Sequence, residues 1–154
     1  MNSIFFEYKL ENEIFDNIKI KYYDIYDLKK SFSGVIYIHI HYSTGERKEI
    51  ILETGILDYI NQFDSMFSHI DEGNNEAFTV SYDFYSNSLD YLYNEHTNEL
   101  VISESNAGLF KINCNYDDFK QSYKKFRKKT LNKLIVSFPQ LKENSAFKKY
   151  FIDC

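Results

Sequence analysis

The stretch VIYIHIHYS, residues 35–43, alternates its side chains in a way that decides how the rest of the chain is interpreted. Successive residues of a β-strand point to opposite faces of its sheet. One face of this strand would carry Ile36, Ile38, Ile40 and Tyr42. The other face would carry Val35, Tyr37, His39 and His41. The turn sequence STGE and the run RKEIILE (47–53) follow, so the pattern predicts a β-hairpin with one buried face.

Further strands are predicted on both sides of this hairpin. Short runs rich in Tyr, Phe and Ile, with alternating polarity, are typical of strands. Such runs occur at residues 3–10, 17–28, 76–84, 89–103 and 108–114. The polar sequence NEHTN within the fourth run indicates a turn, so that run is expected to form two strands.

The segment 54–71 changes to the period of an amphipathic helix. Its apolar residues recur every three or four positions, with polar residues largely opposite. Thr54 is a candidate N-cap, and the sequence EGNN ends the pattern. A helix is therefore predicted at about 55–70.

A second helical segment, residues 115–138, is longer. Asn115 can cap it, and aspartates occupy the first turn, where the helix dipole favours negative charge. Pro139 ends it, which predicts a helix at about 116–137 and a short closing helix over 144–151.

The order of these elements predicts an α+β fold in a single domain, residues 1–154. We expect a mainly antiparallel sheet of about six to eight strands, with the two main helices packed on one face. The length suits one compact domain, and 44% hydrophobic residues suffice for a core. No apolar stretch is long enough for a transmembrane helix, and acidic residues come too early for a secretory signal, so a cytoplasmic location is expected.

The two histidines of the opening stretch raise the question of a metal site. His39 and His41 would lie roughly 6–7 Å apart along one face of a strand, which allows chelation. A stable site usually needs a third or fourth ligand, and the sequence fixes none. The preferred interpretation is a half-exposed strand face. A small metal-dependent enzyme built on these two residues remains an alternative.

Motifs for other chemistry are not found in the sequence. There is no glycine-rich phosphate loop, no G-x-S-x-G and no H-E-x-x-H. Cys114 alternates with Phe110 and Ile112, which predicts a buried thiol rather than a nucleophile. The chain has one other cysteine, Cys154, and two reduced thiols fit a reducing compartment, although a bridge between them stays open. We therefore predict no catalytic residues and no cofactor.

Charge is distributed unevenly along the chain. Residues 1–114 carry 19 acidic against 8 basic residues, a balance of −11, while residues 115–154 carry 4 against 10, a balance of +6. The basic run could contact phosphates or form a solvated helix face, and the overall charge of −5 favours the second interpretation, without nucleic-acid binding. The run consists of Lys124, Lys125, Arg127, Lys128, Lys129 and Lys133.

The acidic middle of the chain is interspersed with tyrosines. Tyrosine is a good interface anchor, and surrounding carboxylates would steer a basic protein partner. A plain acidic surface with tyrosines partly in the core is an equally open interpretation. The candidate partner-binding residues are Asp71, Glu72, Asp83, Tyr85, Asp90, Tyr91, Tyr93, Glu95, Glu99 and Glu104.

Several pieces of the chain carry a resemblance to a known family. They are FFEYKL, ETGILDYI, FTVSYDF, YLYNEHTNELVIS and the ending FKINCNYDDFKQSYKKFRKKTLNKLIVSFPQL. In order and pattern they resemble small bacterial immunity proteins, which are encoded beside polymorphic, contact-dependent or secretion-delivered toxins. The resemblance implies a non-enzymatic inhibitor in the cytoplasm that binds a cognate toxin domain, often a nuclease. A general protein-binding adaptor is the main alternative, and the oligomeric state is left open.

Overall fold

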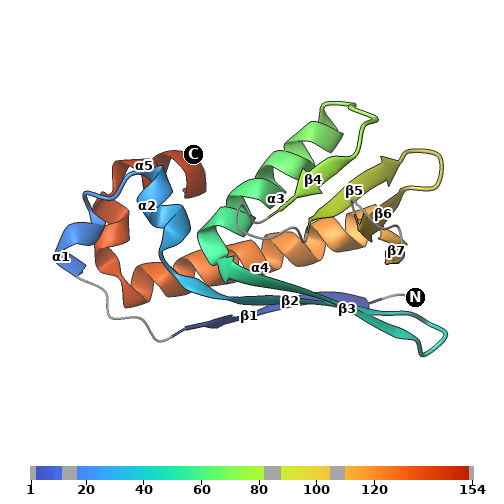
Figure 1. Cartoon of the computed structure of the whole chain (residues 1–154), viewed down its shortest axis with the longest axis horizontal. Coiled ribbons are helices and arrows are strands. Elements are labelled where there is room, and N and C mark those ends of the chain that lie inside the picture. Colours follow the sequence, from blue (N-terminus) through green and yellow to red (C-terminus); the bar gives the residue numbers. More distant parts are fainter. Residues whose placement is uncertain (1–2, 12–16, 82–87, 105–109, 153–154) are drawn as a thin grey trace.

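The computed structural model describes residues 3–11, 17–81, 88–104 and 110–152. Within these ranges the chain forms two antiparallel sheets, with helices packed against them (Figure 1). The first sheet has the strand order β1 (Ser3–Leu10), β2 (Ser33–His41), β3 (Arg47–Gly55). The second has the order β4 (Phe78–Val80), β5 (Leu89–Asn94), β6 (Glu99–Glu104), β7 (Lys111–Asn115). The predicted α+β class with antiparallel strands is confirmed, but the strands are divided between two sheets.

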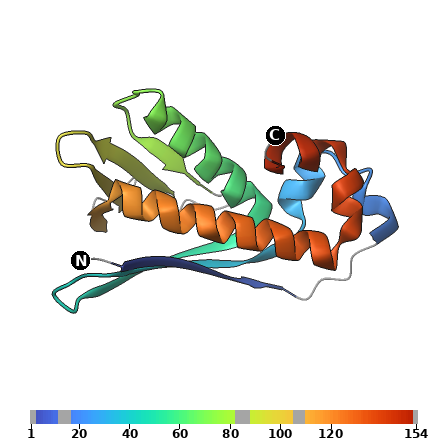
Figure 2. The ribbon, with the colours of Figure 1, turned by 180° about the vertical axis from the view of Figure 1, so that it is seen from behind.

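Two long helices and several short ones complete the described part of the chain. The long helices are α3 (Ile56–Asp71) and α4 (Tyr116–Ser137). The short ones are α1 (Asn17–Ile20), α2 (Ile25–Lys30), the 3₁₀ helix η1 (Pro139–Glu143) and α5 (Ser145–Phe151). Figure 2 shows α4 extending alongside the first sheet, from the second sheet at one end to η1 and α5 at the other.

Aromatic side chains join the helices to both sheets. The ring of Phe6 on β1 lies 6.2 Å from that of Phe63 on α3 and 5.2 Å from that of Phe119 on α4. Tyr91 on β5 contacts the same two rings from the second sheet, at 5.7 and 6.2 Å. Phe63 and Phe119 therefore belong to one core that both sheets share, which fixes the sheets relative to the helices.

The hairpin predicted from residues 35–53 is confirmed as β2 and β3. Ile36, Ile38 and Ile40 are buried on the inner face, whereas His39 and His41 on the other face are half-buried. Register places His39 between Phe5 of β1 and Glu49 of β3. The inner face supplies the core, and the outer face is left to contact solvent or a partner.

The strand predicted at 17–28 is wrong, because this segment forms α1 and α2. The backbone N–H of Asp27 donates to Asp24 Oδ1 at 2.8 Å, and the N–H of Asp24 donates to Asp27 Oδ2 at 3.1 Å. This reciprocal pair is a capping box, which satisfies two backbone donors that would otherwise lack partners. The helix signal therefore outweighs the strand propensity of the neighbouring Ile and Tyr residues.

The start of α3 also differs from the prediction. β3 continues through Gly55, which is the N-cap of α3, so Thr54 does not cap the helix. A Cβ at residue 55 would lie 2.2 Å from the carbonyl oxygen of Lys29, so only glycine lets α2 approach this closely. Tight packing against α2, rather than a side-chain cap, sets the start of the helix.

The remaining predicted elements are present with changed bounds. β4 covers 78–80 of the predicted 76–84, and residues 82–84 lie outside the described ranges. Asn115 caps α4 as predicted, since its side chain accepts from the N–H of Asp118 at 3.0 Å. None of the helices in the described ranges is both long enough and apolar enough to cross a membrane.

Candidate functional site

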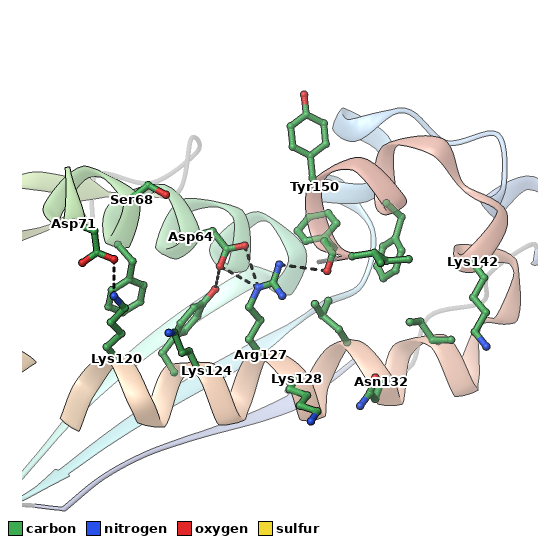
Figure 3. Close-up of a pocket in the computed structure, with 17 residues that line it drawn as sticks. Asp64, Ser68, Asp71, Lys120, Lys124, Arg127, Lys128, Asn132, Lys142 and Tyr150 are labelled. Atoms are coloured by element: carbon green, nitrogen blue, oxygen red, sulfur yellow. Dashed lines mark hydrogen bonds and ion pairs between the residues drawn. The ribbon is translucent and has the colours of Figure 1, made fainter. Parts of the chain in front are cut away.

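A hollow of about 1140 Å³ lies between α3, α4 and α5, and we call it the α4 groove. Figure 3 shows Asp71 and Asp64 on α3 facing Lys120 and Arg127 on α4, with Lys124 and Lys128 on the same helix. These α4 residues are spaced at three or four positions, so they lie along one side of the helix. The groove thus brings three residues of the basic run, together with Lys120, near two carboxylates.

Arg127 bridges the walls of the α4 groove near its middle. Its Nε donates to both carboxylate oxygens of Asp64, each at 3.1 Å, and its Nη2 donates to the carbonyl oxygen of Phe151 at 3.3 Å. The hydroxyl of Tyr123 donates to Asp64 Oδ1 at 2.6 Å. Burial, and then the neighbouring charge of Asp64, raise the pKa of Tyr123, so the hydroxyl stays protonated and keeps donating. This network ties α3, α4 and α5 together.

Asp71 forms a second anchor at the other end of the groove. Its carboxylate accepts from the Tyr116 hydroxyl at 3.0 Å and from the ammonium of Lys120. Burial opposes ionisation of Asp71, but the hydrogen bonds from Lys120 and Tyr116 outweigh it and lower the pKa. The carboxylate therefore stays ionised and engaged in the folded protein.

The other lysines lining the groove make no such pairs. Within the described ranges, Lys124, Lys128 and Lys142 are exposed and form no ion pair with a carboxylate. Lys124 acts on Asp71 through longer-range attraction that lowers the pKa of Asp71. Three ammonium groups are therefore available to a ligand at the rim.

Apolar side chains lie between these charges. Leu131 and Phe67 are nearly buried, Ile135 is half-buried, and Ile152 is 39% exposed at the α5 end. Tyr150 stands on α5 above the groove and is 41% exposed. The α4 groove is therefore amphipathic, with an apolar floor and a basic rim.

A second candidate surface is the outer face of the three-stranded sheet, which we call the sheet face. Its two central rows, as the strand register gives them, are Glu7–Tyr37–Ile51 and Phe5–His39–Glu49. Phe5 is 38% exposed and Ile51 is 53% exposed. The ring of Phe5 stacks on that of His39 at 4.7 Å and meets that of His41 edge-on at 5.1 Å. This face therefore carries one solvent-exposed apolar side chain on each of its edge strands.

The histidines of the sheet face are engaged with neighbouring side chains. His39 Nε2 lies 3.2 Å from Glu7 Oε2, and Nδ1 lies 3.0 Å from Glu49 Oε2. The rings of His39 and His41 have centroids 6.4 Å apart. Among the described residues, no group of three or more His, Cys, Asp or Glu side chains is arranged to hold a metal ion. What the geometry shows here is an aromatic and ionic cluster across the strands.

The described acidic candidates from the sequence lie on several elements. Asp71 and Glu72 lie at the C-terminal end of α3. Asp90 accepts from the Thr79 hydroxyl at 2.6 Å across β4 and β5. Glu95 lies in the turn between β5 and β6. Glu99 and Glu104 lie at the two ends of β6.

The tyrosine candidates also differ from a set of surface anchors. Tyr91 is fully buried in the core, so it cannot contact a partner, and the surface proposed below leaves it out. Tyr93 packs on Tyr116 with centroids 4.6 Å apart, and its hydroxyl donates to Asn98 Oδ1 at 3.0 Å. Asp83 and Tyr85 lie outside the described residues.

Cys114 has the buried position that the alternation predicts. It is 2% exposed on β7. Burial first, and then the charges of Asp118 and Glu99, raise the pKa of the thiol to about 12. A thiol that stays protonated is a poor nucleophile.

Sequence reasoning missed two features of these surfaces. Phe5 and Ile51 lie on the outer face of their strands, and the alternation of FFEYKL and RKEIILE could have placed them there once β2 was chosen as the central strand. The α4 groove depends on how α5 folds back beside α3, for which the local sequence gives no signal.

Comparisons with protein-family models, with curated proteins and with solved structures found no significant match to this chain.

Proposed function

We propose that this chain is a binding protein of the immunity type, which neutralises a cognate toxin domain by covering part of its surface. The sheet face is the contact surface in this proposal. The observation that carries it is the pair of exposed apolar side chains, Phe5 on β1 and Ile51 on β3, which flank Tyr37 and His39 of β2 on a sheet face that no described helix covers. Exposed apolar area of this kind is typical of protein interaction sites.

The charge of the sheet face favours a basic partner. The two central rows carry Glu7 and Glu49, which both contact His39, and they carry no lysine or arginine. Lys9 and Arg47 lie in the outer rows, near the two ends of the face. A partner with basic groups opposite the central carboxylates would be steered into one orientation.

Apolar and acidic groups are expected to contribute differently to binding, because the free energy of removing them from water differs. Burying Phe5, Tyr37 and Ile51 removes apolar area from water, which favours association. Full burial of a carboxylate with its basic partner costs nearly as much as their attraction returns. We therefore expect the apolar side chains of the sheet face to hold the complex, and Glu7 and Glu49 to set its orientation and association rate.

Such a surface suits a toxin that acts on phosphates, such as a nuclease. A nuclease groove is basic because it contacts the phosphate backbone. Carboxylates on the sheet face would occupy the same cationic side chains and exclude the substrate without any chemical step. The proposal therefore includes the nature of the toxin, a nuclease, and the reaction that is inhibited, cleavage of a nucleic acid.

Co-expression tests this function. Cells expressing the toxin domain encoded by the neighbouring gene are expected to survive when this chain is present and to die when it is absent. The chain with Ile51→Arg is expected to lose protection. The matched control is Val136→Arg, because Val136 is also apolar and is 79% exposed, but lies on α4. A neighbouring gene without a toxin domain, or equal protection by both variants, would contradict the proposal.

A further inference from the structure

We propose that the α4 groove is a second protein-binding site, which takes an acidic amphipathic helix. The groove lies on the helical side of the molecule, whereas the sheet face points away from α4. Binding at the groove is therefore independent of whether the sheet face binds a toxin.

The charge balance of the groove selects an acidic ligand. Its lining contains five lysine and arginine side chains and two aspartates. Both aspartates are already engaged, Asp64 by Arg127 and Asp71 by Lys120. The three rim lysines, Lys124, Lys128 and Lys142, have no such pair among the described residues. Carboxylates on a ligand would supply their counter-charges without displacing an existing ion pair.

The shape of the groove matches a helix of about four turns. The α4 residues that line it run from Lys120 to Ile135, which corresponds to about 22 Å along the helix axis. Lys124 and Lys128 are one turn apart, about 6 Å along that axis. Carboxylates three or four positions apart on a partner helix have the same spacing and can face both lysines.

The apolar floor of the groove requires that a ligand also carry apolar side chains. Leu131, Ile135 and Phe67 contribute apolar surface between the charges. A nucleic-acid backbone would leave this surface uncovered and would also face the carboxylates of Asp64 and Asp71. An amphipathic helix covers the floor with its apolar side and reaches the lysines with its acidic side.

The site is preorganised by the network beneath it. Arg127 bridges Asp64 on α3 and the Phe151 carbonyl on α5, so the walls are fixed before a ligand arrives. A ligand therefore does not bear the cost of ordering these elements, which favours binding.

Peptide selection on the full chain tests this inference. A display library of random peptides, each about 16 residues long to match the groove, is selected on the immobilised protein. Enriched peptides are expected to carry acidic residues three or four positions apart, with apolar residues on the opposite side. Enrichment of basic peptides, or no enrichment over an uncoated surface, would overturn the inference.

Matched variants locate the binding. The affinity of the most enriched peptide is expected to fall about tenfold or more for Lys124→Glu/Lys128→Glu. It is expected to change less than about twofold for Lys125→Glu/Lys129→Glu, which alters the same helix and the same net charge outside the groove lining. Equal loss in both double variants would show attraction to overall charge and would overturn the site.

Two further comparisons separate the alternatives. Ile135→Ser is expected to weaken the peptide about fivefold and Val136→Ser to leave it unchanged, because only Ile135 lines the groove. A labelled single-stranded RNA and phosphatidylserine vesicles serve as competing anionic probes. Tighter binding of either probe than of the peptide, lost in Lys124→Glu/Lys128→Glu, would assign the groove to phosphate groups and overturn the inference.

Discussion

Arg127 and Asp64 form an ion pair across the α4 groove, with the guanidinium Nε 3.1 Å from each carboxylate oxygen. The Arg127 side chain is 14% exposed and that of Asp64 is 29% exposed. Solvent therefore screens this pair less than it screens an ordinary surface pair. The pair links α3 to α4. Without it, the carboxylate and the guanidinium would each lie in a partly apolar groove without the other's opposite charge.

Removing either member of this pair is expected to destabilise the fold. Asp64→Ala removes the carboxylate that accepts from Arg127 Nε and from the Tyr123 hydroxyl. The carbonyl oxygens of Phe151 and Ile60 remain as acceptors for the Arg127 Nη2 and the Tyr123 hydroxyl, so we expect a loss of about 1–3 kcal/mol in the free energy of unfolding. Urea denaturation of Asp64→Ala, Arg127→Ala and the double variant measures the coupling between the two residues. Additive losses would show that the two residues do not stabilise each other.

Removing the hydroxyl is expected to change the stability of the fold differently at two buried tyrosines, Tyr91 and Tyr123. The Tyr91 hydroxyl is buried and has no hydrogen-bond partner among the described residues, so Tyr91→Phe is expected to leave stability unchanged or raise it by about 1 kcal/mol. The Tyr123 hydroxyl donates to Asp64, so Tyr123→Phe is expected to cost about 1 kcal/mol. Thermal unfolding of both variants provides the comparison. A larger loss for Tyr91→Phe than for Tyr123→Phe would contradict the assigned hydrogen bonds.

Asn144 is a buried polar residue on which the closing helix depends. Its Nδ2 donates to the carbonyl oxygens of Ile20 and Tyr23 at 2.7 and 2.8 Å, and its Oδ1 accepts from the N–H of Phe147 at 2.8 Å. Asn144→Ala removes all three bonds, and we expect a loss of about 2–4 kcal/mol.

The conservative variant of Asn144 separates the cap from the two donor bonds. Asn144→Asp keeps the acceptor for Phe147 but places a carboxylate oxygen against two carbonyl oxygens. It is therefore expected to destabilise the fold at neutral pH at least as much as Asn144→Ala. Denaturant midpoints at pH 7 provide the measurement, and a stability of Asn144→Asp close to that of the natural chain would refute the role of the donor bonds.

Cys114 is expected to resist alkylation in the folded protein. Burial first, and then Asp118 and Glu99, raise its pKa from 9.0 to about 12. The stabilising contribution of the protonated thiol is therefore complete below about pH 9 and is lost as the pH rises towards 12. Mass spectrometry after iodoacetamide treatment at pH 8 should find Cys114 modified in urea and unmodified in native buffer. Rapid native modification would show that β7 opens readily.

The sequence predicts the parts of the fold in which periodicity and burial agree. The alternation in residues 35–42 correctly separates the buried isoleucines from the histidines. The helical spacing of α3 and α4 is equally clear, because apolar residues recur every three or four positions along each helix and are buried in the structure.

The wrong predictions concern residues whose structure is determined by contacts with distant parts of the chain. Residues 17–28 have strand-forming residues, but the Asp24–Asp27 capping box and burial of Ile20 and Leu28 determine two short helices. Tyr91 is one of the candidate partner-binding tyrosines of the sequence, yet it packs in the core against the rings of Phe63 and Phe119. Neither outcome follows from a local pattern, since each requires contacts between distant segments.

The candidate surfaces could be predicted only in part. The basic run of the sequence includes Lys124, Arg127 and Lys128 of the α4 groove, but it misses Lys120 and Lys142. It also gives no sign of the apolar floor, which distinguishes the groove from a solvated helix face. The acidic candidates were selected by composition, and the structure distributes them over several elements. Composition indicates the sign of a charge, whereas the surface on which charges meet is set by the tertiary fold.

The central claim is that the sheet face is the surface that binds a basic partner. The most direct measurement is calorimetry with the toxin domain that the proposed function expects the neighbouring gene to encode. The purified domain is titrated into the chain, into Ile51→Arg and into the matched Val136→Arg control. We predict that Ile51→Arg weakens binding by about a hundredfold, because it replaces an exposed apolar contact of the sheet face by a cation opposite a basic surface, and that Val136→Arg leaves it unchanged. Equal affinity for Ile51→Arg and the natural chain would contradict the account.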